Sequence, residues 1–140
     1  MKKLMLVAIT ATLAGCAAND GGTGTYHFSV EDALNSPAAE GIVDPSIKLH
    51  FGKSRGQVIK AGVVTNRKTN AVGKTAEVAC NWAFLAGVKQ LQAAAAQSNA
   101  NHVSNIISYY KKQPYTSTSQ YECEVGNIMV GVALKADLAR

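Results

Sequence analysis

The sequence predicts an α+β domain in which an antiparallel sheet of about four strands carries one long helix on one face. Residues 76–97 are rich in Ala, Leu, Gln, Lys and other residue types that tolerate a helix. Two strand-like stretches precede that run, and two more follow it. The expected order along the chain is therefore strand, strand, helix, strand, strand.

The part before the long helix begins with a capping pattern. Ser29 comes before two acidic residues, which predicts a short helix. Residues 47–51 alternate between apolar and polar types and are a predicted strand, and residues 57–65 are predicted to form a second strand. Residues 66–73 are polar and rich in turn formers, so we expect a loop there.

The long helix is predicted to start after Thr75, a residue type that caps helices, with Glu77 near the positive helix end. Its apolar residues cover a wide arc made of two neighbouring stripes. These stripes hold Val78, Trp82 and Leu85, and Cys80, Phe84, Val88 and Leu91. We expect Trp82, Phe84 and Leu85 to be core anchors rather than a ligand cage.

Two strand-like runs follow the helix, at residues 102–111 and 121–134. Residues 113–120 contain a proline and a cluster of Ser and Thr, which predicts an exposed hairpin loop between the strands. In the last run the side chains at 121, 123 and 125 point one way. Gly126 is predicted to mark a bulge where this phase shifts.

The N-terminus has the pattern of a secretory signal. Two lysines precede an apolar run over residues 4–14, which is shorter than the roughly 20 residues needed to cross a bilayer. The run ends in Leu13-Ala14-Gly15-Cys16, which resembles the lipobox of bacterial lipoproteins. This resemblance implies that residues 1–15 are a removed signal peptide and that Cys16 is lipidated.

In Gram-negative lipoproteins the residue after the lipidated cysteine guides sorting, and Ala17 in that position favours the outer membrane. Residues 16–28 are predicted to be a lipidated flexible tether, because residues 17–25 lack large apolar side chains. Residues 29–140 are then expected to form a single periplasmic α+β domain, held to the membrane by the N-terminal lipid.

Once Cys16 is lipidated, Cys80 and Cys123 remain as a pair in an oxidising compartment, where disulfides persist. A bridge between them would close a loop of about 44 residues and stabilise the fold by roughly 4 kcal/mol. Two free buried thiols are the alternative. A metal site is not expected, because the three histidines are scattered singly along the chain.

No cofactor, nucleotide or nucleic acid is expected as a partner. The net charge of +5 includes two lysines of the signal peptide, and the other basic residues are spread along the chain. Gly52-Lys53-Ser54 and Gly73-Lys74-Thr75 resemble the end of a phosphate loop, but the glycine that such a loop needs upstream is absent from both.

No arrangement of residues indicates catalysis, so the protein is not expected to be an enzyme. Cys80 is predicted to lie among apolar residues rather than beside a histidine base. Glu122 and Glu124 share one predicted sheet face but lack neighbours that would separate their pKa values.

Five segments are similar to small proteobacterial lipoproteins of unassigned function, which are often described as "excinuclease ATPase subunit". These segments are residues 26–34, 65–74, 79–85, 105–112 and 121–123. More distantly, a helical cysteine followed by a strand, a hairpin and a second cysteine resembles the envelope-stress sensor lipoprotein of the Rcs phosphorelay. The same pattern is also similar to heavy-metal-binding-like domains, in which a helix packs on a sheet.

Together these features predict an outer-membrane-anchored, non-enzymatic lipoprotein with a protein partner in the cell envelope. It is expected to be a structural or accessory component of an envelope complex. A stress sensor that relays to a signalling partner is the alternative, and binding of a small envelope ligand is a third possibility. A short tether favours work near the membrane, and so favours the structural role.

Replacing Cys16 with Ser should abolish lipid attachment, because only the thiol accepts the diacylglycerol. Metabolic labelling with a radioactive or clickable fatty acid would measure this, and uncleaved precursor should accumulate in the inner membrane. Normal processing of the Cys16→Ser protein would contradict the lipoprotein prediction.

Overall fold

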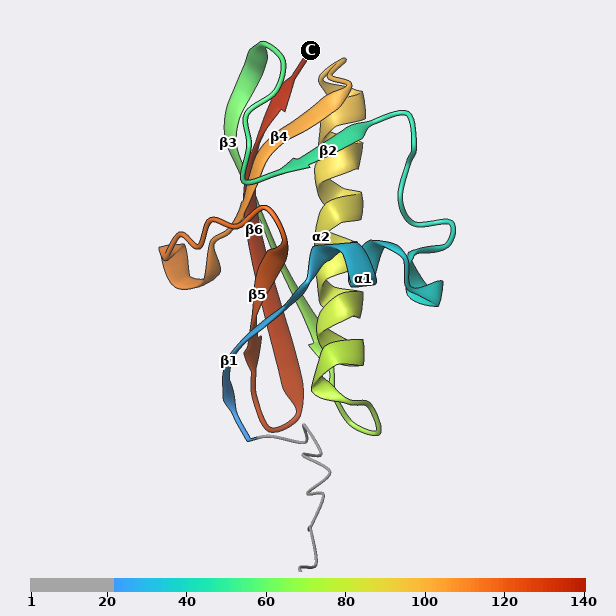
Figure 1. The fold of residues 1–140 in the computed structure, drawn as a ribbon, viewed down its shortest axis with the longest axis vertical. Helices are drawn as coiled ribbons and strands as arrows, with labels where there is room; N and C mark the ends of the chain where they lie inside the picture. Colours follow the sequence, from blue (N-terminus) through green and yellow to red (C-terminus); the bar gives the residue numbers. More distant parts are fainter. Residues whose placement is uncertain (1–21) are drawn as a thin grey trace, which may run out of the picture.

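The computed structural model describes residues 22–140. Its longest helix has 22 residues and runs alongside the sheet (Figure 1). This helix, α2, spans Ala76–Gln97. The Thr75 hydroxyl accepts a hydrogen bond from the Val78 amide, and Glu77 lies in the first turn, so the predicted N-terminal cap is confirmed. No helix in the described part of the chain is long and apolar enough to cross a membrane.

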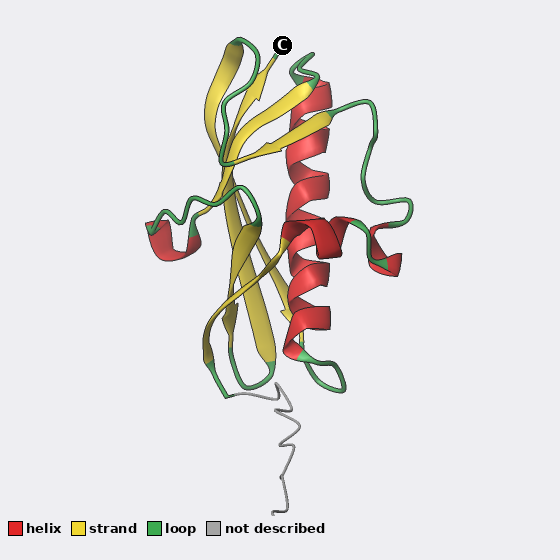
Figure 2. Cartoon of the chain, viewed as in Figure 1, coloured by secondary structure: helices red, strands yellow, loops and turns green. Residues whose placement is uncertain are grey.

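Six strands form one sheet. The sheet lies beside α2, as Figure 2 shows. Strand β6 lies at its centre and is paired on both edges. On one edge it pairs with β3 in antiparallel orientation along its whole length. The other edge is shared, because β5 pairs with the start of β6 and β4 pairs with its C-terminal half. The strands are β1 Gly24–Ser29, β2 Lys48–Phe51, β3 Val58–Asn70, β4 His102–Ser108, β5 Gln120–Val125 and β6 Met129–Ala139.

Because β5 and β4 share one edge of β6, the sheet divides there into two strand pairs, which we call its wings: β1 with β5, and β2 with β4. β1 adds to β5 in antiparallel orientation, and β2 adds to β4 in parallel orientation. The α+β class with one long helix is confirmed, but the prediction of an antiparallel sheet of about four strands is wrong in two respects. The sheet has six strands, and the pairing of β2 with β4 makes it mixed. A parallel neighbour requires a crossover, which β3 and α2 supply between β2 and β4.

The predicted tether over residues 16–28 is too long at its C-terminal end. Residues 24–29 form β1, in which Tyr26 pairs with Cys123 and Phe28 pairs with Tyr121. The aromatic residues of β1 pack against the core, with the Phe28 and Tyr121 ring centroids 6.1 Å apart. The folded domain therefore begins before residue 29. The predicted signal peptide and Cys16 lie outside the described residues.

Two predicted boundaries in the sheet are also wrong. The polar segment expected to be a loop at 66–73 belongs largely to β3, because β6 provides a hydrogen-bonding partner as far as Asn70. Gly126 is not a bulge within one strand. It starts the turn between β5 and β6, where its amide donates to the Met129 carbonyl. The predicted hairpin between the runs at 102–111 and 121–134 is replaced by β4 and β5 lying end to end along β6.

Helix α2 packs chiefly on β6 and β3, and a glycine brings it close to them. A Cβ atom on Gly87 would lie only 3.2 Å from Leu134 Cδ1 and from Thr65 Oγ1, so a bare backbone at this position suits the close approach. The largest fully buried side chains lie between the two layers or in the wings. They include Tyr121, Phe84, Leu91, Ile106, Leu134 and Leu138.

The opposite face of β6 is covered in part by the turn η2, Tyr110–Lys112. A Cβ atom on Gly131 of β6 would lie 3.1 Å from the Tyr110 ring, so this glycine leaves room for the aromatic side chain. Lys135 Nζ lies 4.7 Å from the centroid of the neighbouring Tyr109 ring, a cation–π contact. The sheet is thus protected on both faces at its centre.

Candidate functional site

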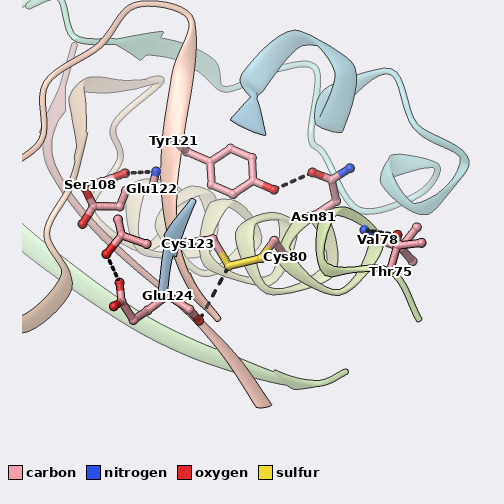
Figure 3. Close-up of a disulfide and its surroundings, with 10 residues drawn as sticks. Thr75, Val78, Cys80, Asn81, Ser108, Tyr121, Glu122, Cys123 and Glu124 are labelled. Carbon is pink, nitrogen blue, oxygen red and sulfur yellow. Dashed lines mark hydrogen bonds between the residues drawn. A yellow bond between two sulfur atoms is a disulfide. The ribbon is translucent and has the colours of Figure 1, made fainter. Parts of the chain in front are cut away.

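A buried disulfide joins α2 to β5, as Figure 3 shows. Cys80 and Cys123 are separated by 43 positions in sequence, and both are fully buried. The alternation predicted for β5 is confirmed, because Tyr121, Cys123 and Val125 are buried while the residues between them are partly exposed. The structure thus contains the predicted bridge in place of the alternative, two free thiols.

An aromatic stack lies next to the disulfide. The Phe84 and Tyr121 rings are nearly parallel, with centroids 4.2 Å apart. The Tyr121 hydroxyl donates a hydrogen bond to the Asn81 side chain, and burial together with the charge of Glu77 raises the pKa of Tyr121 (Figure 3). This tyrosine is therefore a neutral packing group. Phe84 and Leu85 are 0% and 2% exposed, as predicted for core anchors.

Trp82 is not a core anchor, and this prediction is wrong: its side chain is 55% exposed. The reason is the rotation of α2. Successive residues of an α-helix are about 100° apart, so Trp82 points about 200° away from both Cys80 and Phe84. Those two residues face the sheet and turn Trp82 outward. Val78, one helical turn earlier on the same stripe, is 44% exposed.

Trp82 stands between two hollows, with volumes of about 670 and 430 Å³. We call the two hollows together the Trp82 groove. Its floor is the outward stripe of α2, and its outer wall is the connection between α1, Val30–Leu34, and β2. The side chains that matter most are Val78, Trp82 and Ala86 on the floor, Ala38 and Ile42 on the wall, and Arg67 on β3.

The outer wall is fastened to α2 by Gln92, which is 2% exposed. Its side-chain amide donates to the carbonyl oxygens of Asp44 and Ile47, each at 2.9 Å, and its oxygen accepts from the Asp44 amide at 2.8 Å. Gln92 was not among the residues predicted from the sequence to be important. The available signal was a polar residue on the apolar arc, since Gln92 follows Val88 by one turn and Phe84 by two.

The charged residues that line the groove are both basic. Arg67 reaches it from β3 and Lys89 from α2, and the remaining lining residues of the larger hollow are uncharged. An apolar floor with two cations at its margin suits an occupant that has an apolar body and a carboxylate or another anionic group.

A few titratable groups outside the groove have polar partners within hydrogen-bond distance. Glu122 lies 3.2 Å from His27, and Glu124 accepts a hydrogen bond of 2.7 Å from the Thr25 hydroxyl. His50 Nε2 is 2.8 Å from His102 Nδ1. Burial, the neighbouring imidazole and an arginine lower the pKa of His50.

Residues 22–140 contain no cluster of three or more metal-ligating side chains. Comparison with protein-family models, with curated proteins and with solved structures gave no match. The resemblance to small proteobacterial lipoproteins therefore stays a prediction. The Trp82 groove is the candidate site because it combines an exposed aromatic side chain, a hollow and a consistent charge.

Mature protein should contain no free thiol, because Cys16 is expected to carry lipid and Cys80 is bonded to Cys123. Thiol titration of the denatured, unreduced protein should detect none, and reduction should expose both sulfurs of the bridge. Replacing both cysteines with Ala should lower the free energy of unfolding by about 2–5 kcal/mol, measured by chemical denaturation. Two reactive thiols before reduction would rule out the bridge.

Trp82→Ala and Phe84→Ala form a matched pair of truncations on one helix. Phe84→Ala should lower the free energy of unfolding by about 3–5 kcal/mol, because it removes a buried ring from the stack. Trp82→Ala should change it by less than about 1 kcal/mol, because most of the indole is exposed. Thermal and chemical denaturation measure both. Equal losses would show that Trp82 stabilises the fold and does not serve a partner.

Proposed function

We propose that the protein is a non-enzymatic lipoprotein, anchored through Cys16 in the outer membrane and facing the periplasm, that binds another envelope protein in the Trp82 groove. Its role is that of a structural or accessory component of an envelope complex. The lipobox-like residues before Cys16, and Ala17 after it, support the anchor. The groove supports the binding role.

The single observation that carries this proposal is the exposure of Trp82. Tryptophan is enriched among the residues that dominate the energy of protein–protein interfaces, where it fills a pocket and loses contact with water. The indole is the only one in the chain, and it stands between two hollows instead of filling the core. A side chain of this size gains most from burial by a partner.

The expected occupant is an apolar segment of the partner that carries carboxylates at its edge. Its apolar side chains would cover Val78, Trp82 and Ala86, and its carboxylates would reach Arg67 and Lys89. Arginine pairs with carboxylates through two parallel hydrogen bonds, which gives such a contact direction as well as strength.

The groove is held in one shape, which favours a structural role over a sensor. Gln92 fastens its wall, and the disulfide and the aromatic stack hold the floor. A preorganised surface loses less entropy on binding. The chain between Cys16 and the fold is also shorter than the sequence suggested, because β1 begins at Gly24. This limits the reach that a sensor of distant partners would need.

The proposal is tested by placing a photoreactive phenylalanine analogue at position 82 and irradiating living cells. A discrete protein adduct is expected. The same analogue at Val64 is the control, because Val64 is 48% exposed but lies on the opposite face of β3 from Thr65, which faces α2. Arg67→Glu or Lys89→Glu should reduce the adduct at position 82 severalfold, whereas Lys112→Glu, outside the groove, should not.

An equal yield at positions 82 and 64 would contradict a specific site at Trp82. An adduct with a lipid or another small molecule alone would contradict a protein partner and favour binding of a small envelope ligand. Unchanged crosslinking after both charge reversals would remove the role of the carboxylates.

A further inference from the structure

The two most exposed large hydrophobic side chains of residues 22–140 lie at one end of the molecule. Val72 is 65% exposed in the loop between β3 and α2, and Ile128 is 63% exposed in the turn between β5 and β6. The two loops are joined, because the Ala71 amide donates to the Ile128 carbonyl at 2.9 Å. Met129, the next residue, is 39% exposed. We call Val72, Ile128 and Met129 the apolar tip.

The chain that leads back to Cys16 leaves the fold at the same end. Gly24 is paired with Val125, which lies directly before the β5–β6 turn. In Figure 1 the start of β1, the β5–β6 turn and the loop before α2 all lie at the lower end, with the C-terminus at the upper end. The apolar tip and the entry of the chain thus share one end of the domain.

The length of the connecting chain limits how far this end can be from a lipid on Cys16. Gly22 follows Cys16 by six positions, and a fully extended chain of that length spans at most about 20 Å. The lower end of the domain must therefore stay close to the bilayer surface whenever Cys16 is inserted. Exposed aliphatic groups held that close to lipid can leave water for the acyl boundary.

We infer that the apolar tip rests in the headgroup region of the bilayer and orients the domain on the membrane. This inference rests on the lipid anchor of the proposed function. Apolar contact is the driving force, because the charges near the tip are balanced: Lys74 follows Val72 closely, and Glu77 lies in the first turn of α2. With the tip in contact, the long β3–β6 pair extends away from the surface (Figure 1).

The chain offers a direct test, because Trp82 is its only tryptophan. Trp82→Phe gives a background without indole, into which Val72→Trp, Ile128→Trp or Val58→Trp is introduced singly. Val58 is the matched control. It is 45% exposed but pairs with Ala139, at the far end of β6 from Met129, about 34 Å away along the strand. Each mature lipidated variant is reconstituted into phosphatidylethanolamine–phosphatidylglycerol vesicles, with or without brominated acyl chains.

Indoles at positions 72 and 128 should emit at shorter wavelength in vesicles than in detergent-free buffer, and brominated lipid should quench them. The indole at 58 should show neither effect. Because the two reporters lie on different loops, a folding defect in one variant leaves the other as an independent measurement. The melting temperature of each variant is compared with that of Trp82→Phe.

Flotation of the vesicles separates failure of this inference from failure of the anchor. Protein that floats without quenching at 72 and 128 overturns the inference and leaves the anchor in place. Equal quenching at 58 also overturns it, because the domain would then lie on its side. A spectral shift without lipid quenching indicates contact with protein, such as a second copy, and overturns it as well. Protein that does not float overturns the anchor and the inference together.

Discussion

The rotation of α2 about its own axis determines most of what this molecule presents to its surroundings. Two contacts set that rotation: the Cys80–Cys123 bridge and the stack of Phe84 on Tyr121. Both point into the sheet. Because each residue of a helix is turned by about 100° from the last, the positions of the other side chains follow. Trp82 must face outward.

The same rotation places Gln92 where it can hold the α1–β2 connection, so the core and the groove depend on one another. A different rotation would bury the indole and leave the amide of Gln92 without its backbone partners at Asp44 and Ile47. A buried amide without hydrogen bonds costs about 1–3 kcal/mol. The packing of the core and the hydrogen bonds of the Gln92 side chain therefore favour the same orientation of the helix.

The end of the groove at Val78 and Trp82 lies near the apolar tip. Trp82 is six residues from the start of α2, or about 9 Å along the helix axis, and α2 starts at the same end as the tip. If the tip rests on lipid, the groove opens close to the membrane. A partner would then be one that is itself membrane-bound or held near the outer membrane, and the short connection to Cys16 gives no freedom to search further.

Local patterns in the sequence were sufficient for the helix, its Thr75 cap and the alternation of β5, because each depends on near neighbours. The pairing of Cys80 with Cys123 was predicted from the count of cysteines that remain after Cys16, and the structure contains it. Only the tertiary structure decided how the strands are arranged. β3 extends to Asn70 because β6 pairs with it there, and β1 exists because β5 offers an edge to Tyr26 and Phe28. The outward position of Trp82 was also a tertiary outcome. The apolar arc of α2 is wide enough for several rotations, and the disulfide with the Phe84–Tyr121 stack selects one of them.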